Sequence, residues 1–248
     1  LRRQRQMCIR DSEKTGMLRR VRQVRQHLCN RCPQAYGRIG SFVKPSPTNN
    51  QPFNPERDPR RNVEINIGKA CNNRCVFCID GLPKREDRSY MPFPLMKGEL
   101  DRYYKDGFRS VGFLGGEPTT YPKICDSVAY ARQLGYTRIA IATNATKLRL
   151  THFTDRIIDA GLTRVTISMH GHTADLEDRL TRVPGNFEKK VAAIEYLQHK
   201  RAQGFLPDGL SVNIVLNGWN YKHLPKMMQF FYRTCLLYTS DAADEERG

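Results

Sequence analysis

The sequence lacks any run of about 18 consecutive apolar residues, the length that a membrane-spanning helix requires. It also lacks an opening basic segment followed by an apolar stretch, which is the pattern of a secretory leader. No segment repeats with a fixed period, so a solenoid of stacked repeats is not expected. These absences predict a soluble, cytoplasmic, globular protein without a membrane segment.

Acidic residues are scarce relative to basic ones. The 248 residues include 25 Asp and Glu against 41 Lys and Arg, which gives a formal net charge of +16. Such a surface attracts polyanions, anionic substrates and acidic peptides. A solvated basic surface without a specific ligand is the simplest explanation of the charge alone, and RNA binding is the alternative that the charge keeps open.

Both ends of the sequence carry a signature that does not come from protein structure. One DNA element, read in opposite directions, can encode both MCIRD near the start and CLLYT near the end. This element resembles the mosaic-end adapter of transposase-based sequencing libraries. We therefore expect residues 1–12 and 235–248 to be adapter-derived, and the natural protein to continue beyond Thr234.

Residues 13–61 form a basic extension with two features of their own. A short helix is expected at residues 17–28, and the prolines of residues 44–59 predict an extended connector. Cys29 and Cys32 stand at C-x2-C spacing, which is typical of half a zinc site or of part of a second metal cluster. A free pair without a metal is the alternative.

Residues 62–234 alternate between short β-branched apolar runs and longer amphipathic segments. Strands are expected at residues 62–68, 109–115, 137–143, 164–169 and 210–217. Helices are expected at residues 94–107, 121–135, 151–161, 186–204 and 221–234. Glycines suited to a C-cap close four of these helices, namely Gly107, Gly135, Gly161 and Gly204. The alternation predicts right-handed βαβ units and an α/β fold with a parallel sheet.

Unusual polar motifs follow every expected strand. They are CNNRCVFC at 71–78, GGEP at 115–118, TNAT at 143–146, SMHG at 168–171 and LNGWN at 216–220. Parallel α/β folds build their sites at the carboxyl ends of the strands. The five motifs are therefore expected on one rim.

The first motif places Cys71, Cys75 and Cys78 at C-x3-C-x2-C spacing, without a fourth cysteine or histidine nearby. Structural zinc normally takes four ligands. An iron–sulfur cluster is held by thiolates, and a cubane with only three leaves one iron open for another ligand. A non-catalytic zinc module that binds nucleic acid through the same cysteines is the competing hypothesis.

The cysteine spacing, with Phe77 just before the last cysteine and GGEP after the next strand, resembles the radical S-adenosylmethionine (radical SAM) superfamily over about residues 62–234. The resemblance implies a partial parallel (β/α)6 barrel, here truncated after about five strands. It implies a [4Fe-4S] cluster and S-adenosylmethionine as cofactors, and a reductant protein such as a flavodoxin or ferredoxin. The enzyme would reductively cleave S-adenosylmethionine to a 5′-deoxyadenosyl radical, which abstracts hydrogen from a substrate.

The resemblance also implies roles for residues on the rim. Gly115 and Gly116 would let the backbone approach the methionine end closely, and Glu117 would accept from the ammonium. Phe77 would pack beside the adenine, and Ser168 would contact the ribose or the carboxylate. Further members of this cofactor site would be Pro118, Asn144, His170 and the backbone of residues 215–217.

Several residues have a purely structural alternative. Phe77 could be core packing, and Asn144 could hold a turn or cap a helix. His170 could be a loop histidine, which is the favoured interpretation of His172. Cys125, with apolar neighbours in an expected helix, is interpreted as a small buried hydrophobic residue.

The sequence names no general acid or base and no defined substrate. Residues 169–187 resemble the corresponding segment of superfamily members that act in peptide maturation and in cofactor biosynthesis, and these two classes are favoured. A peptide or another anionic molecule is therefore the expected substrate. Modification of tRNA is the alternative, and RNA binding would weaken steeply with salt.

Overall fold

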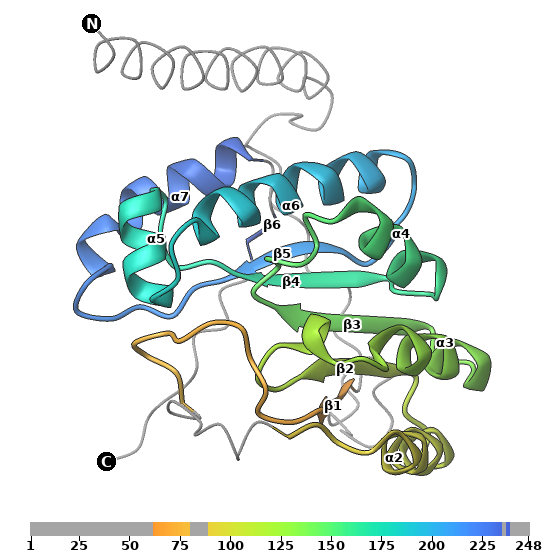
Figure 1. Ribbon diagram of the computed structural model, residues 1–248. Coiled ribbons are helices and arrows are strands. Elements are labelled where there is room, and N and C mark those ends of the chain that lie inside the picture. Colours follow the sequence, from red (N-terminus) through yellow and green to blue (C-terminus); the bar gives the residue numbers. More distant parts are fainter. Residues whose placement is uncertain (1–61, 80–88, 235–236, 239–248) are drawn as a thin grey trace, which may run out of the picture. The chain divides into compact units, whose positions relative to one another are not determined.

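A computed structural model describes residues 62–79, 89–234 and 237–238 of the chain (Figure 1). The helix expected at residues 17–28, the connector at residues 44–59 and the Cys29–Cys32 pair lie outside the described residues. None of the helices within the described part is both long enough and apolar enough to cross a membrane.

The fold is built on a parallel sheet whose strands follow one another in chain order. Its first five strands are β1 (Asn62–Asn66), β2 (Ser110–Leu114), β3 (Arg138–Thr143), β4 (Arg164–Ser168) and β5 (Gly209–Asn213). Each pair of neighbours is parallel and in continuous register, with Val63 opposite Val111 and Val111 opposite Ile139. All five expected strands are confirmed, although β5 ends before residues 214–217.

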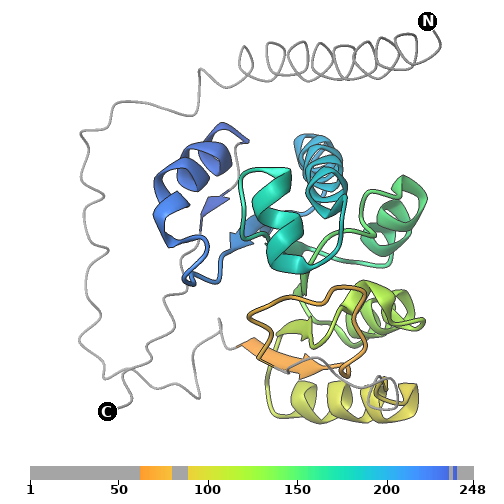
Figure 2. The same cartoon turned by 60° about the vertical axis from the view of Figure 1, so that its left-hand side comes forward.

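Helical segments connect the strands. The helices are α2 (Phe93–Lys105), α3 (Ile124–Leu134), α4 (Thr151–Asp159), α5 (Ala174–Thr181), α6 (Asn186–Ala202) and α7 (Leu224–Arg233), with short 3₁₀ turns η3 (Pro118–Thr120) and η4 (Tyr221–His223). Figures 1 and 2 show these helices along one face of the curved sheet. The four glycines expected to follow helices have φ between +91° and +118°, the left-handed conformation of a helix-ending glycine. The described part is thus an open, partial α/β barrel.

Helix α5 was not expected from the sequence. Its N-cap is Thr173, whose side chain accepts from the Leu176 amide, and Asp175 and Glu177 occupy its first turn. These are ordinary signals for the start of a helix. The apolar stripe of α5 is only Leu176 and Leu180, because its eight residues span little more than two turns.

The sheet also has a sixth strand, β6 (Leu237–Tyr238), which pairs in parallel with Ser211 and Val212 of β5. A barrel truncated after about five strands, as the resemblance implies, would leave β5 as an exposed edge, but over these two residues β5 is paired. The strand lies in a segment expected to be adapter-derived. Because an edge strand presents unpaired N–H and C=O groups, any nearby extended segment can pair with it.

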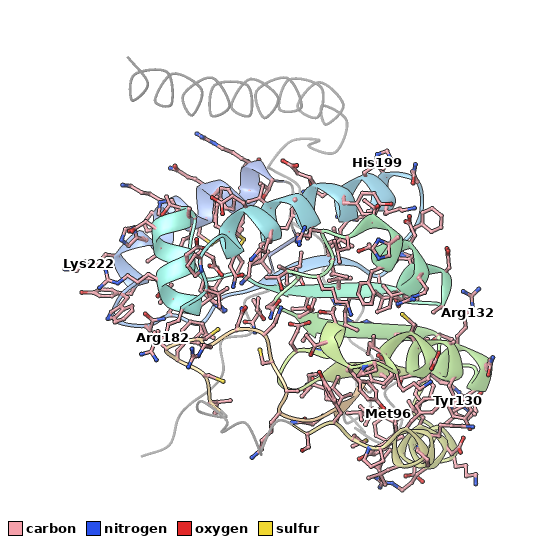
Figure 3. The ribbon with its side chains drawn as sticks, in the orientation of Figure 1. Met96, Tyr130, Arg132, Arg182, His199 and Lys222 are labelled. Carbon is pink, nitrogen blue, oxygen red and sulfur yellow. The ribbon has the colours of Figure 1, made fainter. Side chains whose placement is uncertain are left out.

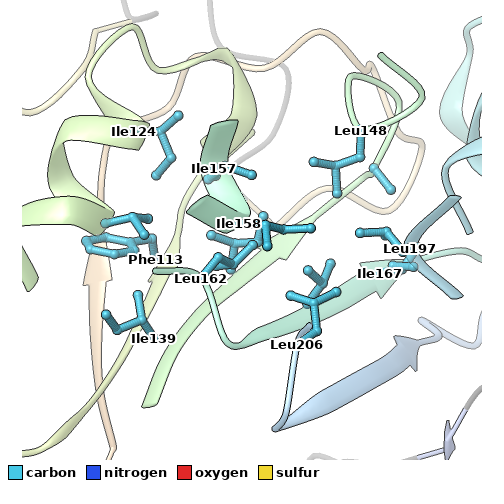
Figure 4. Packing of buried hydrophobic residues seen from close by; sticks show 14 of the residues in the cluster. Phe113, Ile124, Ile139, Leu148, Ile157, Ile158, Leu162, Ile167, Leu197 and Leu206 are labelled. Atoms are coloured by element: carbon cyan, nitrogen blue, oxygen red, sulfur yellow. The ribbon is translucent and has the colours of Figure 1, made fainter. Parts of the chain in front are cut away.

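The hydrophobic core lies between the sheet and its helices. Figure 4 shows Phe113, Ile139 and Ile167 of the strands packed with Ile157 of α4 and Leu197 of α6. All five are at most 1% exposed. Fully burying a side chain of this size contributes about 1.5–3 kcal/mol. The core thereby fixes the strands and the positions of the loops at their carboxyl ends.

Candidate functional site

The structure brings the five motifs to one edge of the sheet, as the sequence predicted. The cysteine loop follows β1, GGEP follows β2, TNAT follows β3, SMHG closes β4 and LNGWN follows β5. Figure 3 shows the sulfur atoms of the cysteine loop at this edge, near the labelled Arg182. The parallel order of the strands is what collects residues so distant in sequence.

Backbone hydrogen bonds fix the cysteine loop against the end of α5. The amide of Arg74 donates to the carbonyl of Thr181 (3.0 Å), and the amide of Val76 donates to the carbonyl of Leu180 (2.9 Å). The last carbonyls of a helix have no partner within the helix. The loop therefore satisfies the end of α5, and α5 in turn determines the path of the loop.

Side-chain amides tie the same loop to two other elements. Asn72 accepts from Asn144 Nδ2 (2.7 Å) and donates to Thr146 Oγ1 (2.9 Å), both at the end of β3. Asn73 accepts from Asn186 Nδ2 (2.8 Å), in the first turn of α6. Neither asparagine was assigned a role from the sequence alone, although two adjacent asparagines inside the cysteine loop were an available signal.

The three cysteine thiols are free, with Cys71 and Cys75 half-buried and Cys78 exposed. Burial raises the pKa of Cys71 to about 11, and the amide of Asn73, which donates to its sulfur (3.3 Å), opposes this increase. Burial also raises the pKa of Cys75. Thiolates at these positions need a compensating positive charge, which a bound metal cluster supplies because it deprotonates its thiol ligands.

The three cysteines are a donor set that could hold a multi-iron cluster. In the described part of the chain, no three His, Cys, Asp or Glu side chains converge closely enough to hold one metal ion. In a cubane, by contrast, each cysteine binds a different iron. Among the described residues, Asn73 Nδ2 is buried without a hydrogen-bond partner. It is a donor available to a sulfur atom at this position.

Gly115 and Gly116 are required by the backbone beside them. A Cβ on Gly115 would lie 2.6 Å from the carbonyl oxygen of Gly68, and one on Gly116 would lie 2.6 Å from that of Lys69. The amide of Gly116 donates to the Gly68 carbonyl (2.8 Å), and the amide of Glu117 donates to that of Ala70 (2.8 Å). The glycines therefore allow the β1 and β2 loops to pack together, and their expected close approach to a ligand stays a prediction.

Glu117 is 1% exposed, and its carboxylate is already engaged by protein donors. One oxygen accepts from the amide (2.9 Å) and hydroxyl (2.6 Å) of Thr119 and from the hydroxyl of Thr143 (2.5 Å). The other accepts from the amide of Asn144 (2.6 Å). In the structure, Glu117 joins the ends of β2 and β3, where the sequence analysis expected an acceptor for a ligand ammonium.

Asn144 has the turn-holding role that was its structural alternative. Its Oδ1 accepts from the amide (3.0 Å) and hydroxyl (2.8 Å) of Thr146, which is an Asx turn. Its Nδ2 reaches Asn72 of the cysteine loop. Pro118, the other residue in question, is buried as the first residue of η3.

At the end of β4, His170 is 3% exposed and makes several contacts. Its Nδ1 accepts from the amide of Val215 (3.0 Å), which places the ring proton on Nε2. Its ring meets Phe77 edge-on with centroids 4.4 Å apart. Burial holds the pKa of His170 well below its ordinary value, and the charge of Lys190 adds to this effect. His170 is thus a neutral packing residue between the cysteine loop and the loop after β5.

A buried ion pair supports His170 and was not anticipated from the sequence. Lys190 Nζ lies 2.5 Å from Glu177 Oε1, and both side chains are at most 1% exposed. The ammonium also donates to the carbonyl of Ser168 (2.7 Å), while Glu177 Oε2 accepts from the amide of His170 (2.7 Å). The pair therefore positions the backbone on both sides of Met169. Ser168 itself is half-buried at the end of β4.

The remaining residues lie at the margin of the site. His172 is half-buried in the loop after β4 with its ring 5.4 Å from that of His223. Cys125 is half-buried in α3 and packs against the core, in line with its hydrophobic interpretation. In the 215–217 segment, the amide of Val215 is used by His170, and its carbonyl accepts from Asn220 (2.9 Å). The side chains of Val215 and Leu216 are 38% and 51% exposed.

Comparison with known proteins agrees with this geometry. Residues 65–231 match the model of the radical SAM superfamily. The AdoMet-dependent heme synthase of Methanosarcina barkeri is 29% identical over 143 residues, which cover 56% of this chain and 39% of the relative. The probable GTP 3′,8-cyclase of Metallosphaera sedula is 27% identical over 174 residues, which cover 69% of this chain and 52% of the relative.

Among solved structures, Streptococcus suis SuiB bound to S-adenosylmethionine has a TM-score of 0.56 and 22% identity, over 71% of this chain and 38% of SuiB. SuiB bound to its precursor peptide SuiA gives the same score and identity. This similarity shows a shared fold. The chain spans about half the length, or less, of the curated relatives described above. Because the family model matches more than half of its residues, the chain belongs to the radical SAM superfamily.

Proposed function

We propose that Cys71, Cys75 and Cys78 ligate the [4Fe-4S] cluster of a radical SAM enzyme, with S-adenosylmethionine bound beside it at the carboxyl ends of the strands. Members of this superfamily are enzymes that use both cofactors. The observation that carries the proposal is the cysteine loop itself, tethered against α5, α6 and the end of β3. When bound, the two cofactors supply a 5′-deoxyadenosyl radical that abstracts hydrogen from the substrate.

The residues of the rim divide into tethers and exposed contact groups. Asn73 and Glu117 hold the loops in register through buried hydrogen bonds, and Asn72 does so through a part-buried one. Phe77 and Ser168 are half-buried and so retain surface for contact with the bound cofactor. A site assembled from fixed loops holds reacting groups in a productive geometry and excludes water from them.

For the substrate we propose a peptide undergoing maturation or a precursor in cofactor biosynthesis. The relatives named as a heme synthase and a GTP cyclase support the second class, and the bound peptide of SuiB supports the first. The net charge of +16 favours an anionic molecule in either class. Family membership leaves the zinc-module hypothesis without support.

The test begins with the full chain, reconstituted anaerobically with iron and sulfide and then reduced in the presence of S-adenosylmethionine. We expect iron and acid-labile sulfide in equal amounts, and 5′-deoxyadenosine as a product. Cys75→Ala should abolish both, whereas Cys125→Ala, a cysteine outside the loop, should retain both. Colourless protein that retains zinc, or equal product from the Cys75→Ala variant, would overturn the assignment.

A salt titration separates RNA from the favoured substrates. If RNA were the partner, its affinity would fall by orders of magnitude between about 50 and 200 mM salt, because phosphate contacts release counterions. We expect only weak, non-specific RNA binding that disappears over this range. Retention of tight binding to one RNA at physiological salt would replace the proposed substrate class.

A further inference from the structure

A basic cavity lies beside the cysteine loop, on the side of the helices. Its volume is about 360 Å³. Asn72 of the cysteine loop forms one wall, Lys147 and Arg149 come from the loop after β3, and Asn186 and Lys189 come from the first turn of α6. Nothing in the proposed cofactor site uses Arg149 or Lys189.

The charged residues that line this cavity are all basic. Three of its lining residues are cationic, and none of the lining residues in the described part is acidic. Two more exposed arginines lie close to lining residues along the chain: Arg74, two residues after Asn72, and Arg182, next to Val183. The carboxylate of the nearby Asp178 is engaged by the backbone: its two oxygens accept from the amides of Gly185 (2.6 Å) and Phe187 (2.9 Å).

Not all of the cations are equally available to a partner. Lys147 donates to the carbonyl of Thr119 (2.8 Å) and its Nζ lies over the ring of Phe153, 4.2 Å from the ring centroid, so this side chain is engaged within the fold. Arg149 is exposed, and Lys189 is half-buried in the first turn of α6. These two side chains, together with Arg74 and Arg182, form what we term the basic face.

The cavity and the basic face both reach the cysteine loop next to proposed cluster ligands. Asn72, which lines the cavity, directly follows Cys71, and Arg74 of the basic face directly precedes Cys75. The other lining residues come from the end of β3 and the loop after it, from Val183 and from the first turn of α6. A partner bound at the basic face would therefore lie close to the cysteine loop.

We propose that the basic face is the docking surface of an acidic one-electron donor protein. The proposal rests on the proposed function, since the superfamily needs a reductant. In the step itself, one electron leaves the donor and enters the cluster, and no bond or proton is transferred. Electron-transfer encounters are small interfaces below about 1,200 Å². They are steered by complementary charge, which a face of four cations supplies.

The test measures the rate at which the reconstituted full chain is reduced, by following the loss of the oxidised cluster's absorbance in a stopped-flow instrument. The reductants are a reduced acidic flavodoxin and, separately, reduced methyl viologen. The variant Arg149→Glu with Lys189→Glu reverses the basic face. The control Lys105→Glu with Arg201→Glu makes the same charge change in the last turns of α2 and α6, at the opposite edge of the sheet.

We expect flavodoxin to reduce the face variant about tenfold more slowly than the control at low salt, within the range of electrostatic steering. The difference should shrink as salt rises, and methyl viologen should reduce both proteins at the same rate. Equal flavodoxin rates would overturn the proposal, as would a slowing that is independent of salt, since that indicates a distorted loop. A reducible cluster that yields no 5′-deoxyadenosine would overturn the proposed function and leave the docking result standing.

Discussion

The carboxylate of Glu117 offers the sharpest test of how the rim is held together. Replacing it by the isosteric amide, Glu117→Gln, turns one acceptor oxygen into a donor nitrogen. In the less costly orientation, the nitrogen faces the amide of Asn144 and strands that buried donor, while the bonds to Thr119 and Thr143 lose the help of the charge. A lost hydrogen bond to a charged group costs about 1.5–3 kcal/mol, and stranding a buried donor adds to this. We expect a total loss of about 3 kcal/mol.

The assay is urea unfolding of the cluster-free protein, so that no cofactor contributes. Glu64→Gln is the matched control, because Glu64 is exposed on β1 and should change the free energy of unfolding by less than about 0.5 kcal/mol. The slope with urea should stay constant, showing that only stability has changed. If Glu117→Gln were as stable as the control, the carboxylate would not be a structural clamp.

Three further predictions concern the neighbouring elements. Gly116→Ala should lower the free energy of unfolding by about 1–3 kcal/mol, because the added methyl group would overpack against two carbonyl oxygens. Gly98→Ala, where the methyl group meets open space on α2, should raise it by about 0.5–1 kcal/mol. Similar unfolding free energies for the two variants would contradict this prediction. Lys190→Met should cost about 3–5 kcal/mol by leaving Glu177 buried and unpaired, and adding Glu177→Gln should recover part of the loss in a double-mutant cycle. Burial lowers the pKa of His170 in the folded state, so the contribution of His170 to the free energy of unfolding is complete above pH 6.5. As pH falls below 6.5, this contribution should be lost at about 1.4 kcal/mol per pH unit. The same pH slope of the unfolding free energy in His170→Gln would refute this prediction.

The fold could be predicted largely from periodicity. The β-branched runs of β1 to β5 and the amphipathic segments between them are strong local signals, and the structure confirms each. Helix α5 was not predicted because its eight residues carry only a short apolar stripe between charged positions. The pairing of Leu237 and Tyr238 with β5 depends on which segment reaches an open edge, which local sequence does not specify.

The candidate site was predictable only where spacing along the chain encodes it. The three cysteines stand out because one loop must supply all of them. The residues that hold the loops in place do not stand out in the sequence. Asn73 contacts Asn186, 113 positions away, and Lys190 pairs with Glu177 on the preceding helix. A motif such as GGEP also does not reveal which way its carboxylate faces. In the structure Glu117 turns inward to protein donors, so its identity was predicted and its contacts were not.

The two halves of the rim are fastened by different kinds of bond. Neutral amides and backbone groups hold the cysteine loop, and such bonds do not change protonation near neutral pH. The end of β4 instead depends on His170, whose ring must stay uncharged to accept from the amide of Val215 and whose pKa burial lowers. Mild acid should therefore loosen the half of the rim around Ser168 while the thiols keep their places. In such an enzyme, acid would disturb the contacts that the end of β4 makes with the reacting partners before it disturbed the loop that carries the cluster.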